Sequence, residues 1–359
     1  MKKIKIYKNT KIYIACPANV ATGGPELLHQ LAYHFINDVN TEAFMYYYNF
    51  DNFRFQTPVH PAYQMYGNPY VLRIPDDEDN EKNILIVPEV LNVLSLLPKY
   101  KKIRKGVWFL GVDPYYLSRL TKKDYFILRA INKIFKILIK NTPFEFDITS
   151  QKVLKRLMQK YDYKNDPFLK VADFYLFQSY YAIQHFSELN PKYYLSDYLN
   201  KNFLEIQTDL SNKEDIVAYN PAKGFAFTRK IISSAKDIKF TPLINMTRDE
   251  VIKTLQRAKV YIDFGNHSGK DRIPREAAIL GCCVITGKRG SAAFFEDVPI
   301  PNEYKFEDKE ENIPKIIEKI KDCFENFEER YKDFEYYRNI IKNEPKKFLE
   351  DLKKIFVKV

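Results

Sequence analysis

Cysteine and glycine are both scarce in this chain, which has 4 cysteines and 11 glycines among 359 residues. Cys282 and Cys283 are adjacent within an apolar run, and no pair of cysteines has the Cys-x-x-Cys spacing. The pattern therefore indicates neither a disulfide framework nor a zinc site, and buried free thiols in a reducing cytoplasm fit it better. The Gly-x-Gly-x-x-Gly sequence is also missing, which argues against a dinucleotide cofactor.

Histidine is scarce as well, and the five histidines show no metal-ligand spacing: His29, His34, His60, His185 and His267. Residues 76–79 contain an acid-x-acid triplet of the kind that chelates divalent cations. The polar residues that follow them favour a solvated acidic turn instead. No Gly-x-Ser-x-Gly sequence marks a serine nucleophile. We therefore expect neither a bound metal nor a tightly held cofactor.

Long hydrophobic runs are missing too. The apolar run after the basic residues 1–11 covers only 12–16, which is too short for the core of a signal peptide. Hydrophobic residues make up 45% and charged residues 29% of the chain, as in soluble globular proteins. The length suggests two domains, no repeat of 20 to 50 residues indicates a solenoid, and we expect a cytoplasmic protein.

What the chain does contain is an alternation of strand-length apolar runs and helical patterns. The runs lie at 12–15, 43–48, 84–88, 106–112, 174–178, 216–219, 240–243, 260–265 and 282–286. Helical spacing lies at 26–36, 225–234, 249–258 and 274–280, and again at 315–359. This alternation predicts an α/β protein of two doubly wound, Rossmann-like parallel-sheet domains that face a cleft. We place them at 1–200, with a basic helical insertion near 115–166, and at 201–359, with the last helices returning to the first domain.

Ligands in such sheets bind at the carboxyl ends of the strands. Polar residues at predicted strand ends are Asn19, Glu89, Asp113, Gln178 and Ser179. Asp113 lies between Val112 and Pro114, so the start of a turn explains it better than a role toward a substrate.

The segment most typical of a binding site is residues 268–278, which read S-G-K-D-R-I-P-R-E-A-A. It connects a predicted strand to a predicted helix that contains Pro274 in its first turn. Free N–H groups at a helix N-terminus attract anions, phosphates above all. Lys270, Arg272 and Arg275 add full positive charges, so we expect the segment to bind phosphate, with local ion pairs at a solvated helix start as the alternative.

The stretch from 255 to 297 resembles the donor-binding half of GT-B glycosyltransferases, in particular the retaining, family-four-like group. The shared order is a strand at 258–263, a loop at 269–272, a Pro and Glu-Ala helix at 274–278, a strand at 281–286 and a second loop at 287–292. The resemblance implies a nucleotide-diphosphate sugar donor and retention at the anomeric carbon. It is strong over about a hundred residues of the second half and weak before them.

The resemblance also implies roles for individual residues. Those expected at the reacting bond are Arg272, Lys270 and His267. Those expected to bind the donor are Gly23, Gly24, Lys223, Arg229, Asp271, Glu276, Gly290 and Ser291, with Glu276 on the ribose hydroxyls. The family's first glutamate would stand at position 268, where this chain has serine; His267 and Asp271 are the candidates to replace it.

The formal net charge is +11, and part of this excess is concentrated at 121–164, where 11 Lys or Arg stand against 4 acidic residues. Within that segment, 125–140 has the pattern of a basic amphipathic helix. An ordinary domain helix, a peripheral contact with an anionic membrane and a site for an acidic acceptor glycan all remain open. No recognition motif accompanies the charge, so we expect no nucleic-acid partner.

These observations together predict a metal-independent glycosyltransferase of the hexosyltransferase type in surface polysaccharide synthesis. Its partners would be a nucleotide-sugar donor and a glycan or lipid-linked acceptor. A non-catalytic glycan- or membrane-associated protein with the same fold and a nucleotide-sugar epimerase are the alternatives.

Overall fold

The computed structural model describes residues 3–121, 123 and 147–359. It divides into two compact units, which we call unit 1 (1–119, 159–198 and 345–359) and unit 2 (120–158 and 199–344). The chain passes from unit 1 to unit 2 after residue 119, returns to unit 1 at 159 and enters unit 2 again after 198. Residues 345–359 return to unit 1.

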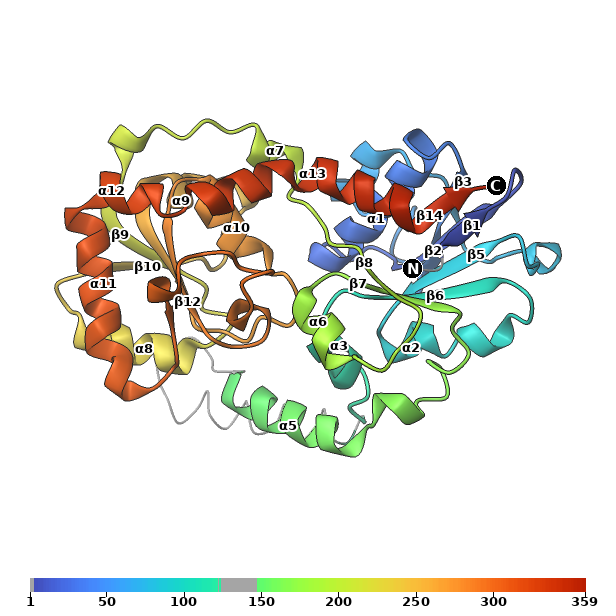
Figure 1. The fold of residues 1–359 in the computed structure, drawn as a ribbon, viewed down its shortest axis with the longest axis horizontal. Helices are drawn as coiled ribbons and strands as arrows, with labels where there is room; N and C mark the ends of the chain where they lie inside the picture. The colour runs from blue at the N-terminus through green and yellow to red at the C-terminus, as the bar shows by residue number, and fades with distance from the viewer. Residues whose placement is uncertain (1–2, 122, 124–146) are drawn as a thin grey trace. The chain divides into compact units, whose positions relative to one another are not determined.

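Unit 1 is built on a seven-stranded parallel sheet with the order β4-β3-β2-β5-β6-β7-β8 (Figure 1). The strands are β2 (Lys11–Pro17), β3 (Glu42–Tyr48), β4 (Tyr70–Val71), β5 (Ile84–Pro88), β6 (Arg104–Phe109), β7 (Phe174–Phe177) and β8 (Lys192–Tyr194). Strands β3 and β4 lie on one side of β2, and β5 and the later strands lie on the other side. This reversal defines a topological switch point, where open α/β sheets bind their ligands.

The helices of unit 1 are α1 (Gly23–Asn37), α2 (Leu91–Leu94), α3 (Val112–Leu117) and α6 (Tyr180–His185). Its short 3-10 helices are η1 (Pro61–Tyr66), η2 (Asp76–Glu78), η3 (Leu97–Lys99) and η4 (Tyr163–Asn165). A separate two-stranded parallel sheet pairs β1 (Ile4–Ile6) with β14 (Phe356–Lys358). Phe356 and Ile4 join the same buried apolar cluster as the residues of β2, so both ends of the described chain are part of one core.

Unit 2 is built on a five-stranded parallel sheet with the order β10-β9-β11-β12-β13. The strands are β9 (Glu214–Tyr219), β10 (Lys239–Pro242), β11 (Ala258–Asp263), β12 (Cys283–Gly287) and β13 (Lys305–Phe306). The switch point of this sheet lies between β9 and β11. All five residues of β12 are buried, as expected for a central strand that helices cover on both faces.

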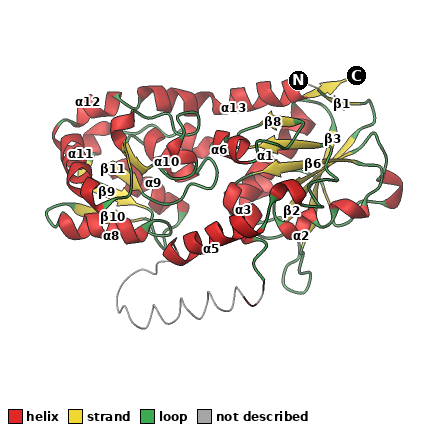
Figure 2. Cartoon of the chain, turned by 60° about the horizontal axis from the view of Figure 1, so that its bottom comes forward, coloured by secondary structure: helices red, strands yellow, loops and turns green. Residues whose placement is uncertain are grey.

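The helices of unit 2 are α7 (Lys201–Leu204), α8 (Phe225–Ser234), α9 (Arg248–Arg257), α10 (Arg272–Ile279), α11 (Ile313–Glu325) and α12 (Phe327–Lys332). Its 3-10 helices are η5 (Leu210–Asn212), η6 (Ser291–Ala293), η7 (Asn302–Tyr304) and η8 (Glu310–Asn312). Figure 2 shows the strands of the units in yellow, with the red helices around them. Helix α13 (Glu335–Ile355) contributes its first ten residues to unit 2 and the remainder to unit 1, and α5 (Asp147–Lys160) overlaps the predicted insertion.

The predicted α/β class with two Rossmann-like parallel-sheet domains is confirmed, and most predicted elements are present. The strand at 84–88 and the helix at 225–234 have the predicted bounds. A capping box of Thr247 and Glu250 forms at the start of α9. The basic helix predicted at 125–140 lies outside the described residues.

Three predictions about the elements were wrong. The strand predicted at 106–112 ends at Phe109, because Gly111 is the N-cap of α3, and this places Asp113 in the first turn of that helix. Helix α1 begins at Gly23, three residues before the predicted start. The last residues of the predicted C-terminal helices form β14, since pairing with β1 outweighs a helical pattern that is weak at 356–358.

A half-buried lysine joins the ends of two helices at the amino-terminal edge of the unit 2 sheet. The Lys213 ammonium donates hydrogen bonds of 2.9, 2.8 and 2.8 Å to the carbonyls of Leu255, Ala258 and Leu280. These carbonyls lie at the C-terminal ends of α9 and α10, where intrahelical donors run out and a cation is favoured. Among the described residues, no helix is both long enough and apolar enough to cross a membrane.

Candidate functional site

Three loops meet at the carboxyl edge of the unit 2 sheet, at its switch point. They follow β9 (220–224), β11 (264–271) and β12 (288–291). Gly224 lies so close to the second loop that a Cβ there would be 2.3 Å from the carbonyl of Phe264. A Cβ on Gly265 would be 2.3 Å from the Cβ of Lys223, so glycine at both positions allows the first two loops to pack backbone against backbone.

The third loop is joined to the second by a parallel β-bridge between Gly290 and His267. The backbone N–H of Ser291 donates to the carbonyl of His267 at 2.9 Å, and the Ser291 hydroxyl donates to the carbonyl of Gly269 at 2.5 Å. Gly290 has a φ of +57°, and a Cβ there would lie 2.0 Å from the His267 carbonyl oxygen. The predicted site residues Gly290 and Ser291 therefore fix the shape of the loop at 264–271, which we call the basic loop.

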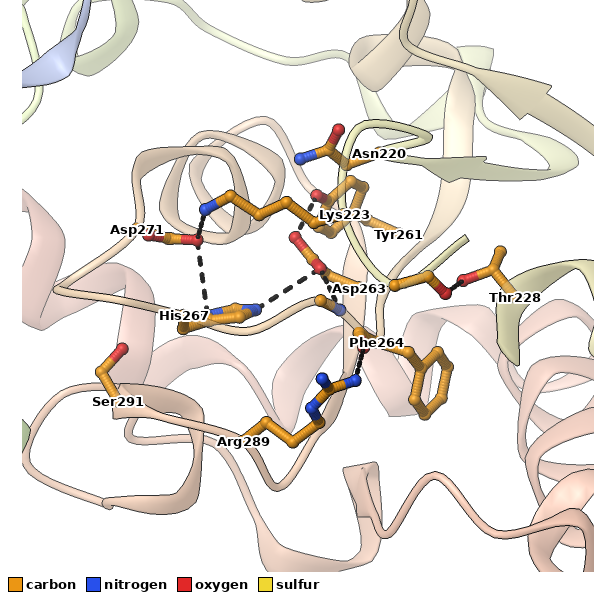
Figure 3. A network of polar contacts seen from close by, with 12 residues as sticks. Asn220, Lys223, Thr228, Tyr261, Asp263, Phe264, His267, Asp271, Arg289 and Ser291 are labelled. Carbon is orange, nitrogen blue, oxygen red and sulfur yellow. Dashed lines mark hydrogen bonds and ion pairs between the residues drawn. The ribbon is translucent and has the colours of Figure 1, made fainter. Parts of the chain in front are cut away.

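A chain of alternating charges connects the loops (Figure 3). The Lys223 ammonium is 2.7 Å from Oδ2 of Asp271, and the same oxygen is 4.0 Å from Nδ1 of His267. On the other side of the ring, Nε2 of His267 is 3.5 Å from Oδ1 of Asp263. Asp263 also accepts hydrogen bonds from the Tyr261 hydroxyl and the Gly265 N–H, both at 2.9 Å. We call Lys223, Asp271, His267 and Asp263 the ion chain.

The burial of the ion chain decreases from Asp263 to Lys223. The side chains of Asp263 and His267 are 1% and 0% exposed, that of Asp271 is 18% exposed and that of Lys223 is 38% exposed. The chain thus reaches from the sheet interior to solvent, and its outermost group is an ammonium.

Burial shifts the ionisation of both inner groups, and their mutual attraction reverses the shift. Burial acts to raise the pKa of Asp263, but the neighbouring His267 and Lys223 cations bring that pKa below its ordinary value. Burial acts to lower the pKa of His267, but the carboxylates of Asp263 and Asp271 raise it above its ordinary value. The ring is therefore favoured as an imidazolium, and two carboxylates balance two cations.

Asp263, His267 and Asp271 also form a group whose ligand atoms, all within 4.8 Å of one another, are close enough to surround a metal ion. The geometry favours ion pairs instead. The two carboxylates face opposite nitrogens of one ring, and one cation cannot bind both of those nitrogens. The Lys223 ammonium already lies against Asp271. We therefore interpret the group as an ion chain and not as a metal centre.

Two further cations, one in the basic loop and one in α10, are held by a glutamate from a distant part of the sequence. Lys270 and Arg275 lie 2.7 and 2.9 Å from the two carboxylate oxygens of Glu344, on α13. The side chain of Lys270 is 6% exposed and that of Arg275 is 0% exposed. The Arg275 guanidinium also donates to the carbonyl of Lys270 at 3.0 Å. This anchoring holds both side chains against α13, whereas the sequence pattern offered their charges for phosphate binding or for ion pairs at the helix start.

The other predicted residues are placed as follows. Arg272 is the first residue of α10 and half-buried, and Glu276 is the fifth residue and 9% exposed. Arg229 is the fifth residue of α8 and half-buried. Gly23 and Gly24 belong to unit 1, where they start α1 at the end of the loop after β2.

Sequence reasoning missed two residues of this site. Asp263 could have been found, because it ends an apolar run and precedes His267 and Asp271 at a spacing of four residues. Glu344 gave no local signal, since it lies in a helical stretch rich in lysine and glutamate, about seventy positions after the loop that it holds.

We compared the chain with known proteins. No protein-family model and no curated protein matches the sequence. Among solved structures, Anabaena HepE in complex with UDP has a TM-score of 0.56 at 9% identity, covering 96% of this chain and 98% of that one. The HepE complex with UDP and glucose has a TM-score of 0.59 at 10% identity over the same shares. The N-terminal domain of Candida albicans trehalose-6-phosphate phosphatase has a TM-score of 0.55 at 10% identity, with 97% of each chain covered. At such identities the likeness shows a common fold.

Proposed function

We propose that this protein is a metal-independent glycosyltransferase that takes its sugar from a nucleoside-diphosphate donor bound to unit 2. The observation that carries the proposal is the meeting of three loops at the unit 2 switch point, where the ion chain ends in the ammonium of Lys223. The fold is shared with HepE, whose structures contain UDP and UDP-glucose. A UDP-sugar is therefore the first donor to test.

In this proposal, the bond between the anomeric carbon and the diphosphate oxygen breaks as an acceptor hydroxyl bonds to that carbon. The hydroxyl proton leaves, and the nucleoside diphosphate departs with increased negative charge. Lys223, Arg272 and the N–H groups at the start of α10 would stabilise that charge, and each charge-assisted hydrogen bond is worth about 1.5 to 3 kcal/mol. Glu276 would accept hydrogen bonds from the ribose.

The same proposal places the acceptor on unit 1. A glycan or a lipid-linked glycan would bind to unit 1 at Gly23 and Gly24, and residues 121–164 would provide a peripheral contact with an anionic membrane. Retention at the anomeric carbon belongs to the same proposal and rests on the resemblance at 255–297.

Calorimetric titration with UDP, GDP, ADP and CMP tests donor binding, and a transfer assay with a panel of nucleotide sugars tests the reaction. We expect one nucleoside diphosphate to bind and its sugar conjugate to be consumed in the presence of an acceptor extract. If none of the four nucleotides bound and none of the sugars were transferred, the proposal would be wrong.

Two other functions use the same fold. A non-catalytic binding protein would bind a nucleotide or glycan with no turnover, and Ser268 in place of the family's first glutamate gives a reason to test it. A nucleotide-sugar epimerase would convert the nucleotide sugar without any acceptor. Product analysis with and without acceptor separates the three.

A further inference from the structure

We propose that His267 is a positioning residue. Its ring becomes the hydrogen-bond donor to Asp271 when Lys223 leaves that carboxylate to bind a diphosphate. The inference rests on the proposed function, because it describes how the same site receives its donor. It assigns His267 an indirect role, because the side chain is 0% exposed.

The Lys223 ammonium cannot pair with Asp271 and with a diphosphate at the same time. Lys223 pairs with Asp271 at 2.7 Å, and the most exposed part of the ion chain is that ammonium. A diphosphate that binds Lys223 must draw it away from Asp271. An aspartate that loses its partner at a partly buried position is costly, and this cost would be subtracted from the affinity for the anion.

Another donor already faces the same oxygen. Nδ1 of His267 lies 4.0 Å from Oδ2 of Asp271, which is beyond hydrogen-bond distance but within reach of a small movement of the carboxylate. Neither ring nitrogen of His267 has a hydrogen-bond partner within the normal distance, although both are buried. The ring is therefore set to gain a hydrogen bond when Asp271 turns toward it.

The charged groups around His267 determine whether its ring is protonated. The groups that face His267 are Asp263 and its partner Tyr261 from β11, Asp271 from the loop before α10, and Lys223 from the loop after β9. From the loop after β12, Arg289 lies nearby on the carbonyl of Phe264 and pairs with Asp308 at 2.7 Å. The two carboxylates raise the pKa of the ring, so it is charged when it takes over Asp271. That charge is present at low pH and is lost as the pH rises through the raised value.

A first experiment needs no nucleotide. The ring of His267 is titrated by NMR in the wild type, with the half-buried His60 as an internal reference. Asp271→Asn should lower the midpoint of His267, and Lys223→Ala should raise it. Inorganic pyrophosphate should raise the midpoint in the wild type and leave it unchanged in Lys223→Ala. The inference would be overturned if the titration midpoint of His267 did not change with either substitution or with pyrophosphate.

A second experiment is a double-mutant cycle on the affinity for UDP and for pyrophosphate. His267→Asn should weaken both by about tenfold, because Lys223 can no longer be released from Asp271 at low cost. Adding Asp271→Asn removes the competing carboxylate and should restore affinity to within about twofold of Asp271→Asn alone. Thermal melting shows that each variant is folded. The matched control is Lys230→Ala, which removes from α8 an exposed ammonium that pairs with Glu310. This variant should bind both ligands as tightly as the wild type.

The outcomes separate the two proposals. If the wild type binds pyrophosphate but no nucleotide, the proposed function is wrong and the exchange of partners is still tested with pyrophosphate. If His267→Asn binds both ligands as tightly as the wild type, or if Asp271→Asn gives no rescue, the exchange is wrong and the proposed function is unaffected. If the wild type binds neither ligand, both proposals are wrong.

Discussion

The two switch points of this molecule have the same topology and opposite chemistry. In unit 1 the helix after the first central strand, α1, carries Glu26 in its first turn, and β5 is followed directly by the buried Glu89. In unit 2 the corresponding helix, α8, follows Lys223, the loop after β11 carries Lys270, and Arg272 is the first residue of α10. A carboxylate neutralises the helix N-terminus of unit 1, whereas cations reinforce those of unit 2.

This contrast shows what topology leaves open. A doubly wound sheet provides a crevice at the carboxyl ends of its strands wherever its order reverses. The side chains that follow those strands decide which ligand the crevice accepts, so a diphosphate is expected in unit 2. Four predictions test this difference.

The largest effect is expected at glycines with a positive φ. Gly290→Ala in unit 2 puts a Cβ 2.0 Å from the His267 carbonyl oxygen, whereas Gly67→Ala in unit 1, at φ +60°, meets nothing within 4 Å. We expect a cost of about 3 to 5 kcal/mol for the first, from overlap plus backbone strain, and about 1 kcal/mol for the second. Thermal melting of both variants measures this, and equal losses would show that the close packing of the unit 2 loops is not required.

The next effect concerns the buried acid of unit 1. Burial raises the pKa of Glu89 to about 7, although the backbone N–H of Leu110 donates to it at 3.0 Å. The unfolded chain loses this proton near pH 4.3, whereas the folded state keeps it up to about pH 7. The free energy of unfolding therefore falls by about 3 kcal/mol as the pH rises across that interval. Glu89→Gln should abolish this part of the pH dependence of the melting temperature. The exposed Glu81→Gln should keep it, and a Glu89 variant with an unchanged pH profile would contradict the assignment.

A smaller effect is expected on ligand affinity. Lys223→Ala should weaken UDP binding by about 10- to 100-fold, the worth of one charge-assisted hydrogen bond. Glu26→Gln, which removes the charge at the corresponding helix of unit 1, should leave the affinity within about twofold of the wild type. Calorimetry decides between them, and an equal loss in both variants would mean that unit 1 takes part in binding the diphosphate.

The smallest effect compares two threonines at helix N-caps. The hydroxyl of Thr247 accepts from the N–H of Glu250 at 3.3 Å, and the Glu250 carboxylate accepts from the N–H of Thr247 at 2.6 Å. Thr22, the N-cap of α1, makes no side-chain capping bond. We expect Thr247→Ala to cost about 1 kcal/mol and Thr22→Ala almost nothing. Denaturation curves for the two variants measure the difference, and a reversed order would contradict the capping geometry.

The fold could be predicted well because its signals are local. The central strands are continuous apolar runs such as β5, and the start of α9 is marked by a threonine followed three residues later by a glutamate. Strands β1 and β14 were missed because each has only three residues, and their stability comes from pairing with a segment at the other end of the chain.

The site could be predicted only in part, for a related reason. The loop at 268–272 shows its charge in the sequence, but the sequence does not show which charges are already paired. Glu344 binds Lys270 and Arg275 from α13, and this leaves Lys223 at the exposed end of the ion chain. The partners of a cation depend on tertiary packing, so residue type and spacing predicted the location of the site more reliably than the role of each side chain.

The pairing of β1 with β14 has a consequence for biosynthesis. Ile4 aligns with Phe356 and Ile6 with Lys358, so β1 cannot pair until β14, about 350 residues later in the sequence, has been synthesised. The two larger sheets have no such dependence, since their last strands in the sequence end at Tyr194 and Phe306, and both can form while the ribosome is still translating α13. Protease resistance in stalled nascent chains should therefore increase a further time in unit 1 once β14 has left the ribosome.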